Sequence, residues 1–270
     1  MLEIRGAYKT FNAGTPNEVR ALQGIDLAVE ESQFVVVIGT NGSGKSTLLN
    51  AIAGTFLLDS GSLTIDGQAI TRWAEHRRAS LIGRVFQNPF SGTAPRMSIA
   101  ENLALAAQRG KRRGLGWALK GRVVAEMKDR VRALGMGLEN RLDNPIGALS
   151  GGQRQALTLL MATWLKPRLL LLDEHTAALD PKSADQVVRL SDEVISRDKL
   201  TTLMVTHSMQ QAAHLGDRLV MMHQGRVIHD FRGAEKRRLR SADLLETFEK
   251  VRARDQLDES AAELLRQRYV

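Results

Sequence analysis

The chain has 270 residues, of which 43% are hydrophobic and 25% are charged, an ordinary composition for a globular protein with a substantial buried core. It contains no cysteine, which excludes disulfides and thiolate metal sites. The net charge is +8, and basic clusters lie at residues 72–78, 109–113 and 232–240. These clusters could bind an anionic membrane surface or nucleic acid, or they could be ordinary solvated faces of the protein.

The sequence also bears on location. No apolar run is long enough to span a bilayer, and residues 1–5 carry charges where a signal peptide needs an apolar segment. We therefore expect a cytoplasmic chain that does not itself cross the membrane.

Short strands are predicted at residues 2–8 and 24–29, on either side of a polar segment, 12–18, that is typical of a hairpin loop. Tyr8 and Phe11 lie just before this loop. Each ring could stack on a nucleotide base or pack in the core.

The next segment carries the most specific motif in the chain. An apolar run at residues 34–38 predicts a buried strand, and the residues after it match the phosphate-binding pattern G-x-x-x-x-G-K-[ST] at every fixed position. The glycines let backbone N–H groups approach phosphate oxygens, and the helix that begins here directs its positive end at the anion. Lys45 would reach the β- and γ-phosphates, and Ser46 would place its hydroxyl on Mg²⁺. The predicted nucleotide-binding residues are Gly39, Thr40, Asn41, Gly42, Ser43, Gly44, Lys45, Ser46 and Thr47.

Beyond this helix, an Asp66-Gly67 turn joins predicted strands at 63–65 and 68–70, which indicates an antiparallel β-layer. Another strand is predicted at 81–86, and it ends at Gln87. From residue 98 to about 142 the apolar residues recur at helical spacing, which predicts a mostly helical insertion interrupted by a basic loop at 109–116.

A long helix is predicted to open in the sequence Leu-Ser-Gly-Gly-Gln at residues 149–153 and to stop at Lys166-Pro167. Strands at 169–172 and 202–205 flank a predicted crossover helix at 181–195, so this part of the sheet should be parallel. A hairpin of residues 219–222 and 226–229 closes the predicted domain. The expected fold class is α/β: a P-loop ATPase core with a mainly parallel sheet, an antiparallel β-layer and an inserted helical subdomain.

Three predicted buried strands end in polar residues: the phosphate loop, the pair Asp173-Glu174, and His207. Ligands bind outside the carboxyl ends of parallel strands, so these residues should form one site. Asp173 would hold Mg²⁺ through water, and Glu174 would orient and deprotonate the attacking water.

With these motifs in place, residues 149–153, lying shortly before the Asp173-Glu174 strand, resemble the signature of ATP-binding-cassette (ABC) ATPases. The resemblance covers residues 2 to about 230 and implies ATP and Mg²⁺ as cofactors. It further implies that Gln87 is the Q-loop glutamine, a metal ligand that also acts in catalysis with Glu174. His207 would be the switch histidine of the catalytic site, and Phe11, rather than Tyr8, would stack on adenine. The implied domains are an ABC ATPase domain at 1–232, with a helical subdomain at about 88–150, and a helical extension at 233–270.

The signature residues Ser150, Gly151, Gly152 and Gln153 stand at the N-terminus of a helix, which is a ready anion site. A second anion site for one γ-phosphate implies a second subunit. In the family, the signature of one cassette closes on the ATP held by another, so we expect a head-to-tail dimer of this chain.

The resemblance also implies partners. We expect an ATPase subunit on the inner face of the cell membrane that powers separate transmembrane permease subunits, with a solute-binding protein as a further partner. The segment 173–180 is similar to importer ATPases of the amino-acid kind, so inward transport of a small solute is the leading hypothesis. The rival hypothesis is an ABC-type ATPase that acts on nucleic acid or the ribosome, although we do not expect nucleic acid as a partner. His175, where the family more often has proline, is interpreted as a spacer.

The extension carries an apolar stripe at Leu244, Leu245, Phe248 and Val251, continued by Leu257, Ala261, Leu264 and Leu265. Such a stripe needs a partner. We expect it to pack on this chain's own core, with the second subunit or the permease as alternatives.

Overall fold

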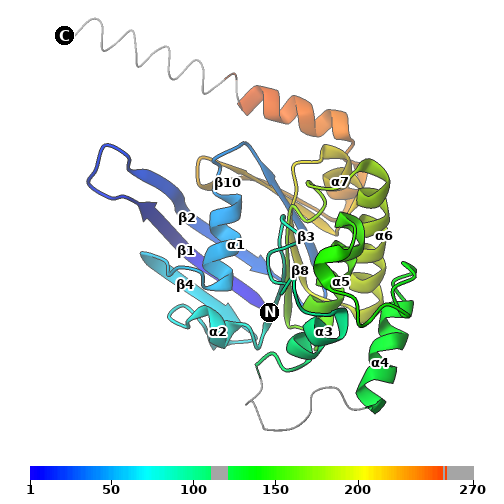
Figure 1. The fold of residues 1–270 in the computed structure, drawn as a ribbon. Coiled ribbons are helices and arrows are strands. Elements are labelled where there is room, and N and C mark those ends of the chain that lie inside the picture. Colours follow the sequence, from blue (N-terminus) through cyan, green and yellow to red (C-terminus); the bar gives the residue numbers. More distant parts are fainter. Residues whose placement is uncertain (111–120, 252, 254–270) are drawn as a thin grey trace, which may run out of the picture.

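The computed structural model describes residues 1–110, 121–251 and 253. Within them the chain forms a four-stranded sheet of order β2-β1-β4-β5 and a six-stranded sheet of order β10-β9-β3-β8-β7-β6 (Figure 1). Helices lie between the sheets and on the outer face of the larger one. The predicted α/β fold, with an antiparallel layer beside a mainly parallel sheet, is confirmed.

The smaller sheet is antiparallel and contains β1 (Leu2–Phe11), β2 (Val19–Val29), β4 (Ser60–Ile65) and β5 (Gln68–Ala69). β1 and β2 are longer than the predicted 2–8 and 24–29. Polar residues beside the hairpin loop still pair across it, for example Thr10 with Arg20. Between β4 and β5, Asp66 (φ 50°) and Gly67 (φ 74°) both adopt positive φ, as the tight hairpin turn predicted there requires.

The larger sheet contains the parallel strands β3 (Phe34–Gly39), β6 (Ile82–Val85), β7 (Leu169–Asp173) and β8 (Thr202–Val205). β9 (Arg218–His223) pairs parallel with β3, and β10 (Arg226–Arg232) pairs antiparallel with β9. Because both faces of the central strands are covered, these strands are continuous apolar runs.

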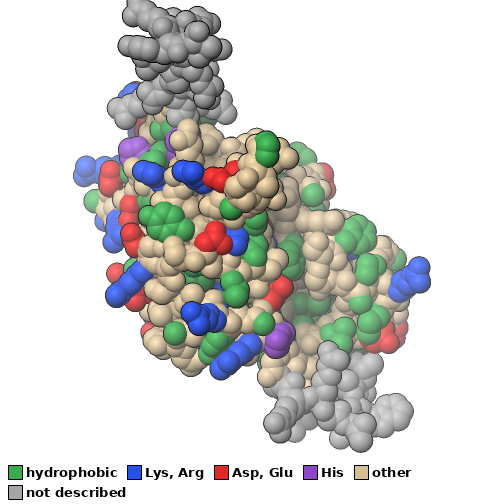
Figure 2. Space-filling model, turned by 90° about the vertical axis from the view of Figure 1, so that its left-hand side faces the viewer, with side chains coloured by type: hydrophobic (Ala, Val, Ile, Leu, Met, Phe, Trp, Pro, Cys, Tyr) green, Lys and Arg blue, Asp and Glu red, His purple; other side chains and the backbone are tan. Residues whose placement is uncertain are grey.

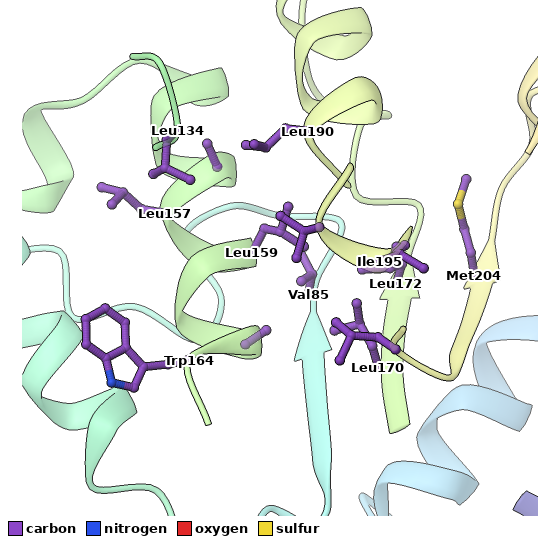
Figure 3. Packing of buried hydrophobic residues seen from close by; sticks show 14 of the residues in the cluster. Val85, Leu134, Leu157, Leu159, Trp164, Leu170, Leu172, Leu190, Ile195 and Met204 are labelled. Carbon is purple, nitrogen blue, oxygen red and sulfur yellow. The ribbon is translucent and has the colours of Figure 1, made fainter. Parts of the chain in front are cut away.

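The two faces of this sheet belong to separate hydrophobic clusters. Val35 and Val37 face the cluster that contains α1 (Lys45–Ala53), which lies between the sheets. Val36 and Ile38 face the cluster that contains α5 (Gly151–Thr163) and α6 (Pro181–Asp198). Figure 3 shows side chains of α5 and α6 packed over those of β6, β7 and β8: Leu157, Leu159, Leu190, Ile195, Val85, Leu170, Leu172 and Met204. The helices α1 and α5 therefore cover opposite faces of one sheet.

Residues 88–150 include α3 (Ile99–Ala107), α4 (Gly121–Arg132) and the 3-10 turn Ile146–Ala148. In the described part of this segment the β-structure is a single bridge between Ser98 and Pro145. Most of the predicted basic loop 109–116 lies outside the described residues.

Four further helical segments complete the described part of the fold. The short helices α2 (Glu75–Arg78) and α7 (Met209–His214) were not predicted, and α8 (Gly233–Arg238) precedes a helix at residues 241–251. Leu244 and Phe248 of the predicted stripe are buried in the cluster of α5, whereas Leu245 is half exposed. This part of the stripe packs on the chain's own core, as expected; the continuation from Leu257 lies outside the described residues. In the described part of the chain, no helix is long and apolar enough to cross a bilayer.

Candidate functional site

The predicted phosphate loop joins the end of β3 to the start of α1, with Gly44 as the residue before the helix. Gly44 has a φ of 94°, and a Cβ at this position would stand 2.3 Å from the backbone oxygen of Ala21. A side chain at Gly39 would meet the backbone oxygen of Met222 at 2.3 Å. Close approach of neighbouring backbone therefore requires both glycines.

Lys45, the first residue of α1, is buried, and its Nζ donates to the carbonyl oxygens of Gly39 (2.9 Å) and Thr40 (3.0 Å). Burial lowers the pKa of Lys45, and the nearby carboxylates of Glu174 and Asp173 oppose this shift. The ammonium group is thus held against the loop backbone, on the side where the two acidic residues lie.

A cavity of about 380 Å³ opens over the N-terminus of α1. Its lining joins residues from distant parts of the sequence: Phe11, Val19, Ala21, Asn41, Gly42, Ser43, Gly44, Lys45, Ser46, Thr47, Glu174 and His207. Residues 41–47 of the predicted loop therefore share one cavity with Glu174 and His207, two of the three predicted catalytic residues. Val19 and Ala21 were missed, because β2 was predicted to begin only at residue 24.

The two aromatic candidates differ in position. Phe11 lines the cavity and packs edge-on against Phe56, with ring centroids 5.2 Å apart. The hydroxyl of Tyr8 stands 2.8 Å from the place where a Cβ on Gly24 would be, so this ring lies over β2. Of the two aromatic candidates, Phe11 is the one that lines the cavity.

Glu174 and His207 follow the neighbouring strands β7 and β8. His207 Nε2 lies 2.6 Å from Glu174 Oε1; the Glu174 side chain is 11% exposed and that of His207 48%. Glu174 has a φ of 45°, a left-handed conformation that is uncommon for residues other than glycine. Its N–H donates to the oxygen of Val205 (3.0 Å), which ties this conformation to the end of β8.

Asp173 at the end of β7 has a cationic partner that the sequence did not reveal. Arg84 Nη2 on the adjacent strand β6 donates to Asp173 Oδ2 at 3.0 Å, and both side chains are largely buried. The Arg84 guanidinium also lies over the Phe86 ring, 4.5 Å from its centroid. A lone arginine inside the apolar segment 81–86 was the available signal.

The remaining predicted site residues lie outside the cavity lining. Gln87 is exposed, two residues beyond the end of β6. Ser150 and Gln153 form a capping box at the start of α5, each side chain bonding to the other residue's N–H at 3.2 Å. Because α5 and α1 cover opposite faces of the sheet, these signature residues do not meet the phosphate loop within one chain.

The signature glycines instead contact the segment after Glu174. A Cβ on Gly151 would lie 3.0 Å from Leu179 Cδ2, and one on Gly152 would lie 2.9 Å from Ser183 Cβ. Asp180 begins α6 by accepting a bond from the Ser183 N–H at 3.0 Å.

His175 is more than a spacer. It is buried, and its Nε2 lies 3.0 Å from Ser191 Oγ on α6. Burial lowers the pKa of His175 to about 4. The side chain therefore joins the end of β7 to α6 as a neutral interior group.

Comparison with known proteins shows similarity over most of the chain. Residues 22–177 match the model of the family described as ABC transporter. The tyrosine transport ATP-binding protein of Clostridioides difficile (strain R20291) is 42% identical over 251 residues, covering 92% of this chain and 99% of the relative. The lipoprotein-releasing system ATP-binding protein LolD of Ruegeria pomeroyi is 35% identical, covering 84% of this chain and 96% of the relative.

Among solved structures, a dimeric ATP-binding cassette in a post-hydrolysis state with ADP and Pi has a TM-score of 0.73 and 26% identity. The match covers 86% of this chain and 98% of that one. The phosphate loop, the acidic strand end and the similarity over nearly the whole chain lead to one conclusion: the chain belongs to the ABC transporter family, as an ATP-hydrolysing, ATP-binding subunit.

Proposed function

We propose that this subunit powers a separate membrane permease that imports a small solute, with an amino acid as the substrate class. The observation that carries the proposal is the cavity in which the phosphate loop meets the Glu174–His207 pair. The tyrosine transport relative, aligned over 99% of its length, supports an amino-acid solute; the lipoprotein-releasing relatives are less similar.

The residues of the cavity fit a nucleoside triphosphate. Ser43 Oγ is buried without a hydrogen-bond partner among the described residues, and Lys45 Nζ is held by two backbone carbonyls. Both groups can turn to phosphate oxygens at the positive end of α1. Phe11 would stack on adenine, and residues 39–47 would hold the phosphates.

The site also fits Mg²⁺. Within the described residues no group of three or more His, Cys, Asp or Glu side chains could hold a metal alone. Mg²⁺ characteristically binds one or two protein carboxylates or hydroxyls together with substrate phosphates and water. Asp173, Ser46 and Gln87 would supply the protein oxygens, and the ion would neutralise phosphate charge during hydrolysis.

In the proposed mechanism, Glu174 orients a water molecule and accepts its proton as the water oxygen bonds to the γ-phosphorus. The bond from that phosphorus to the bridging oxygen breaks in the same step, and ADP leaves with the electron pair. The contact with the Glu174 carboxylate requires a hydrogen on His207 Nε2, and it holds the ring beside the carboxylate until a phosphate oxygen competes for that hydrogen. Lys45 holds the β- and γ-phosphates in place.

Completion of the site calls for a second copy of the chain. Ser150 to Gln153, at the N-terminus of α5, do not line this chain's own cavity, and a helix N-terminus attracts anions. In the proposed head-to-tail dimer it closes on the phosphate held by the other subunit. The dimeric cassette among the similar structures supports this arrangement.

A permease segment would dock beside Gln87. In the segment that follows Gln87 in the sequence, residues between 91 and 110 line a groove of about 810 Å³ together with His76, Arg84 and residues of α5, and Leu105 on its wall is half exposed. Phe90, also half exposed, lies over the guanidinium of Arg154 at 3.6 Å. This proposal places the chain on the inner face of the membrane, with residues 88–150 as the helical subdomain and a solute-binding protein as a further partner.

The basic clusters do not favour the nucleic-acid alternative. One member of each cluster bonds backbone carbonyls inside the fold: Arg78 to Ala51, Arg109 to Ala162, and Lys236 to Ala213. On the face shown in Figure 2, basic and acidic side chains are interspersed. A continuous phosphate-binding patch is not present on that face.

The proposal is tested by copurifying the chain with its permease and measuring ATP hydrolysis in proteoliposomes as amino acids are added. We expect stimulation by an amino acid, and loss of it in Glu174→Gln. Hydrolysis that responds to nucleic acid instead of solute would contradict the transport assignment.

A further inference from the structure

The helix that follows His207 carries a glutamine side chain that joins two loops of the site. Gln211, on α7, accepts a hydrogen bond from Thr206 Oγ1 at 2.8 Å and donates one from Nε2 to Thr176 Oγ1 at 3.2 Å. Both threonines are buried. One amide thus bridges the chain after β7 and the chain after β8.

The two threonines that Gln211 bridges lie close in sequence to Glu174 and His207. Thr206 immediately precedes His207, and Thr176 lies two residues after Glu174. Glu174 and His207, which meet at 2.6 Å, therefore each have a residue bonded to Gln211 within two positions in the sequence.

The bridge itself is held in place. The Ser208 N–H donates to Thr206 Oγ1 (3.1 Å), and Ser208 Oγ accepts from the N–H of Gln211 (3.2 Å), which fixes the start of α7. At the other end of α7, the buried ammonium of Lys236 donates to the oxygen of Ala213 (2.8 Å). A side chain anchored this way can hold two loops at a fixed separation.

Glu174 needs such support. A left-handed conformation at a residue other than glycine persists where surrounding contacts hold it, and Glu174 has a φ of 45°. Its N–H bonds to Val205, and its oxygen accepts from the N–H of Ala177 at 2.9 Å. Thr176 lies inside this turn, so its bond to Gln211 restrains the turn directly.

We propose that Gln211 is a positioning residue for ATP hydrolysis, whose amide holds Glu174 and His207 in register by bridging Thr176 and Thr206. The inference rests on the proposed roles of Glu174 and His207. Gln211 does not line the nucleotide cavity, so it should affect turnover without affecting nucleotide binding.

Full-length variants test this in an ATPase assay. In Gln211→Met we expect kcat to fall roughly ten- to hundred-fold, as displaced catalytic groups do, with KM and the calorimetric Kd for ATP within about two-fold of wild type. Gln211→Glu should recover most of the rate, because a carboxylate can accept from both threonine hydroxyls. Gln210→Met, an exposed glutamine one position earlier on the same helix, is the matched control and should behave as wild type.

A second measurement needs no nucleotide. Hydrogen exchange at the backbone amides of Glu174 and Ala177 should accelerate in Gln211→Met and in Thr176→Val, but not in Gln210→Met, because the turn loses its restraint. Unchanged exchange, wild-type kcat in Gln211→Met, or a parallel loss of kcat and ATP affinity would each overturn the inference.

The Glu174→Gln variant separates this inference from the proposed function. If Glu174→Gln is inactive while Gln211→Met is fully active, Gln211 has no positioning role and the catalytic assignment stands. If Glu174→Gln itself hydrolyses ATP at the wild-type rate, the catalytic assignment fails first.

Discussion

Acid should destabilise this protein through one buried histidine. Ser191 Oγ donates to the oxygen of Val187 at 2.8 Å, so the 3.0 Å contact with His175 requires His175 Nε2 to be the donor. His175 Nδ1 is then left as a bare acceptor, buried and without a partner among the described residues. Protonation would place an unpaired N–H there, and burial accordingly lowers the pKa of His175 to about 4 from an ordinary 6.5.

The sign and size of the effect follow from linkage. Because the folded pKa lies below the unfolded one, the unfolded chain binds the proton more tightly. The contribution of neutral His175 to the free energy of unfolding is fully present above pH 6.5 and is lost as the pH falls to 4. A shift of this size corresponds to about 3 kcal/mol of unfolding free energy in total, of which about 2 kcal/mol is lost by pH 5.

The matched variant is His175→Gln, because an amide can donate to Ser191 and does not titrate. Urea unfolding at pH 7, 5 and 4 should show a wild-type free energy that falls relative to that of the variant by the amounts given. Asp230 titrates outside this window: burial raises its pKa, but hydrogen bonds from Arg218 and Arg232 outweigh that and lower it to about 2. Equal pH dependence of wild type and variant between pH 7 and 4 would refute the reasoning.

Four further outcomes are expected. Glu174→Gln should bind ATP by calorimetry but hydrolyse it at least about 100-fold more slowly, because the accepting carboxylate is lost; wild-type turnover would remove Glu174 as the base. Lys45→Ala should lose ATP affinity in the same titration, and unchanged binding would contradict the phosphate-loop assignment. Ser150→Arg should leave ATP binding by the monomer intact yet abolish hydrolysis, and dimers that still form with ATP and turn over at full rate would exclude the proposed role of α5. Phe248→Ala should cost about 3–5 kcal/mol in urea unfolding, since this ring is buried in the core, while sparing ATP affinity; unchanged stability would show that the 241–251 helix does not pack there.

The phosphate loop was predictable because its backbone conformation and close contacts permit only glycine at certain positions. Gly44 combines a left-handed φ with a backbone oxygen 2.3 Å from its missing Cβ, so no other residue fits and the pattern of glycines survives as a motif. The convergence of Glu174 and His207 was predictable for a similar reason, since parallel strands end at one edge of a sheet.

The contacts between those motifs were not predictable. Arg84 and Asp173 are 89 residues apart, and Gln211 and Thr176 are 35 apart. Hydrogen bonds across such separations leave no periodicity in the sequence. The positive φ of Glu174 could not be predicted either, because a glutamate residue does not indicate a left-handed conformation.

The same geometry explains how one helix can connect the parts of the site. Gln155 on α5 donates from Nε2 to the oxygen of Phe86 at 3.0 Å, next to Gln87, and Arg154 packs on Phe90 just beyond it. The signature glycines at the start of α5 touch Leu179 and Ser183, in the segment that leads on from Glu174. Interiors are close-packed, so α5 cannot shift by more than a fraction of an ångström without breaking these contacts or carrying their partners along. The contacts of α5 therefore link the backbone next to Gln87 with the segment that follows Glu174.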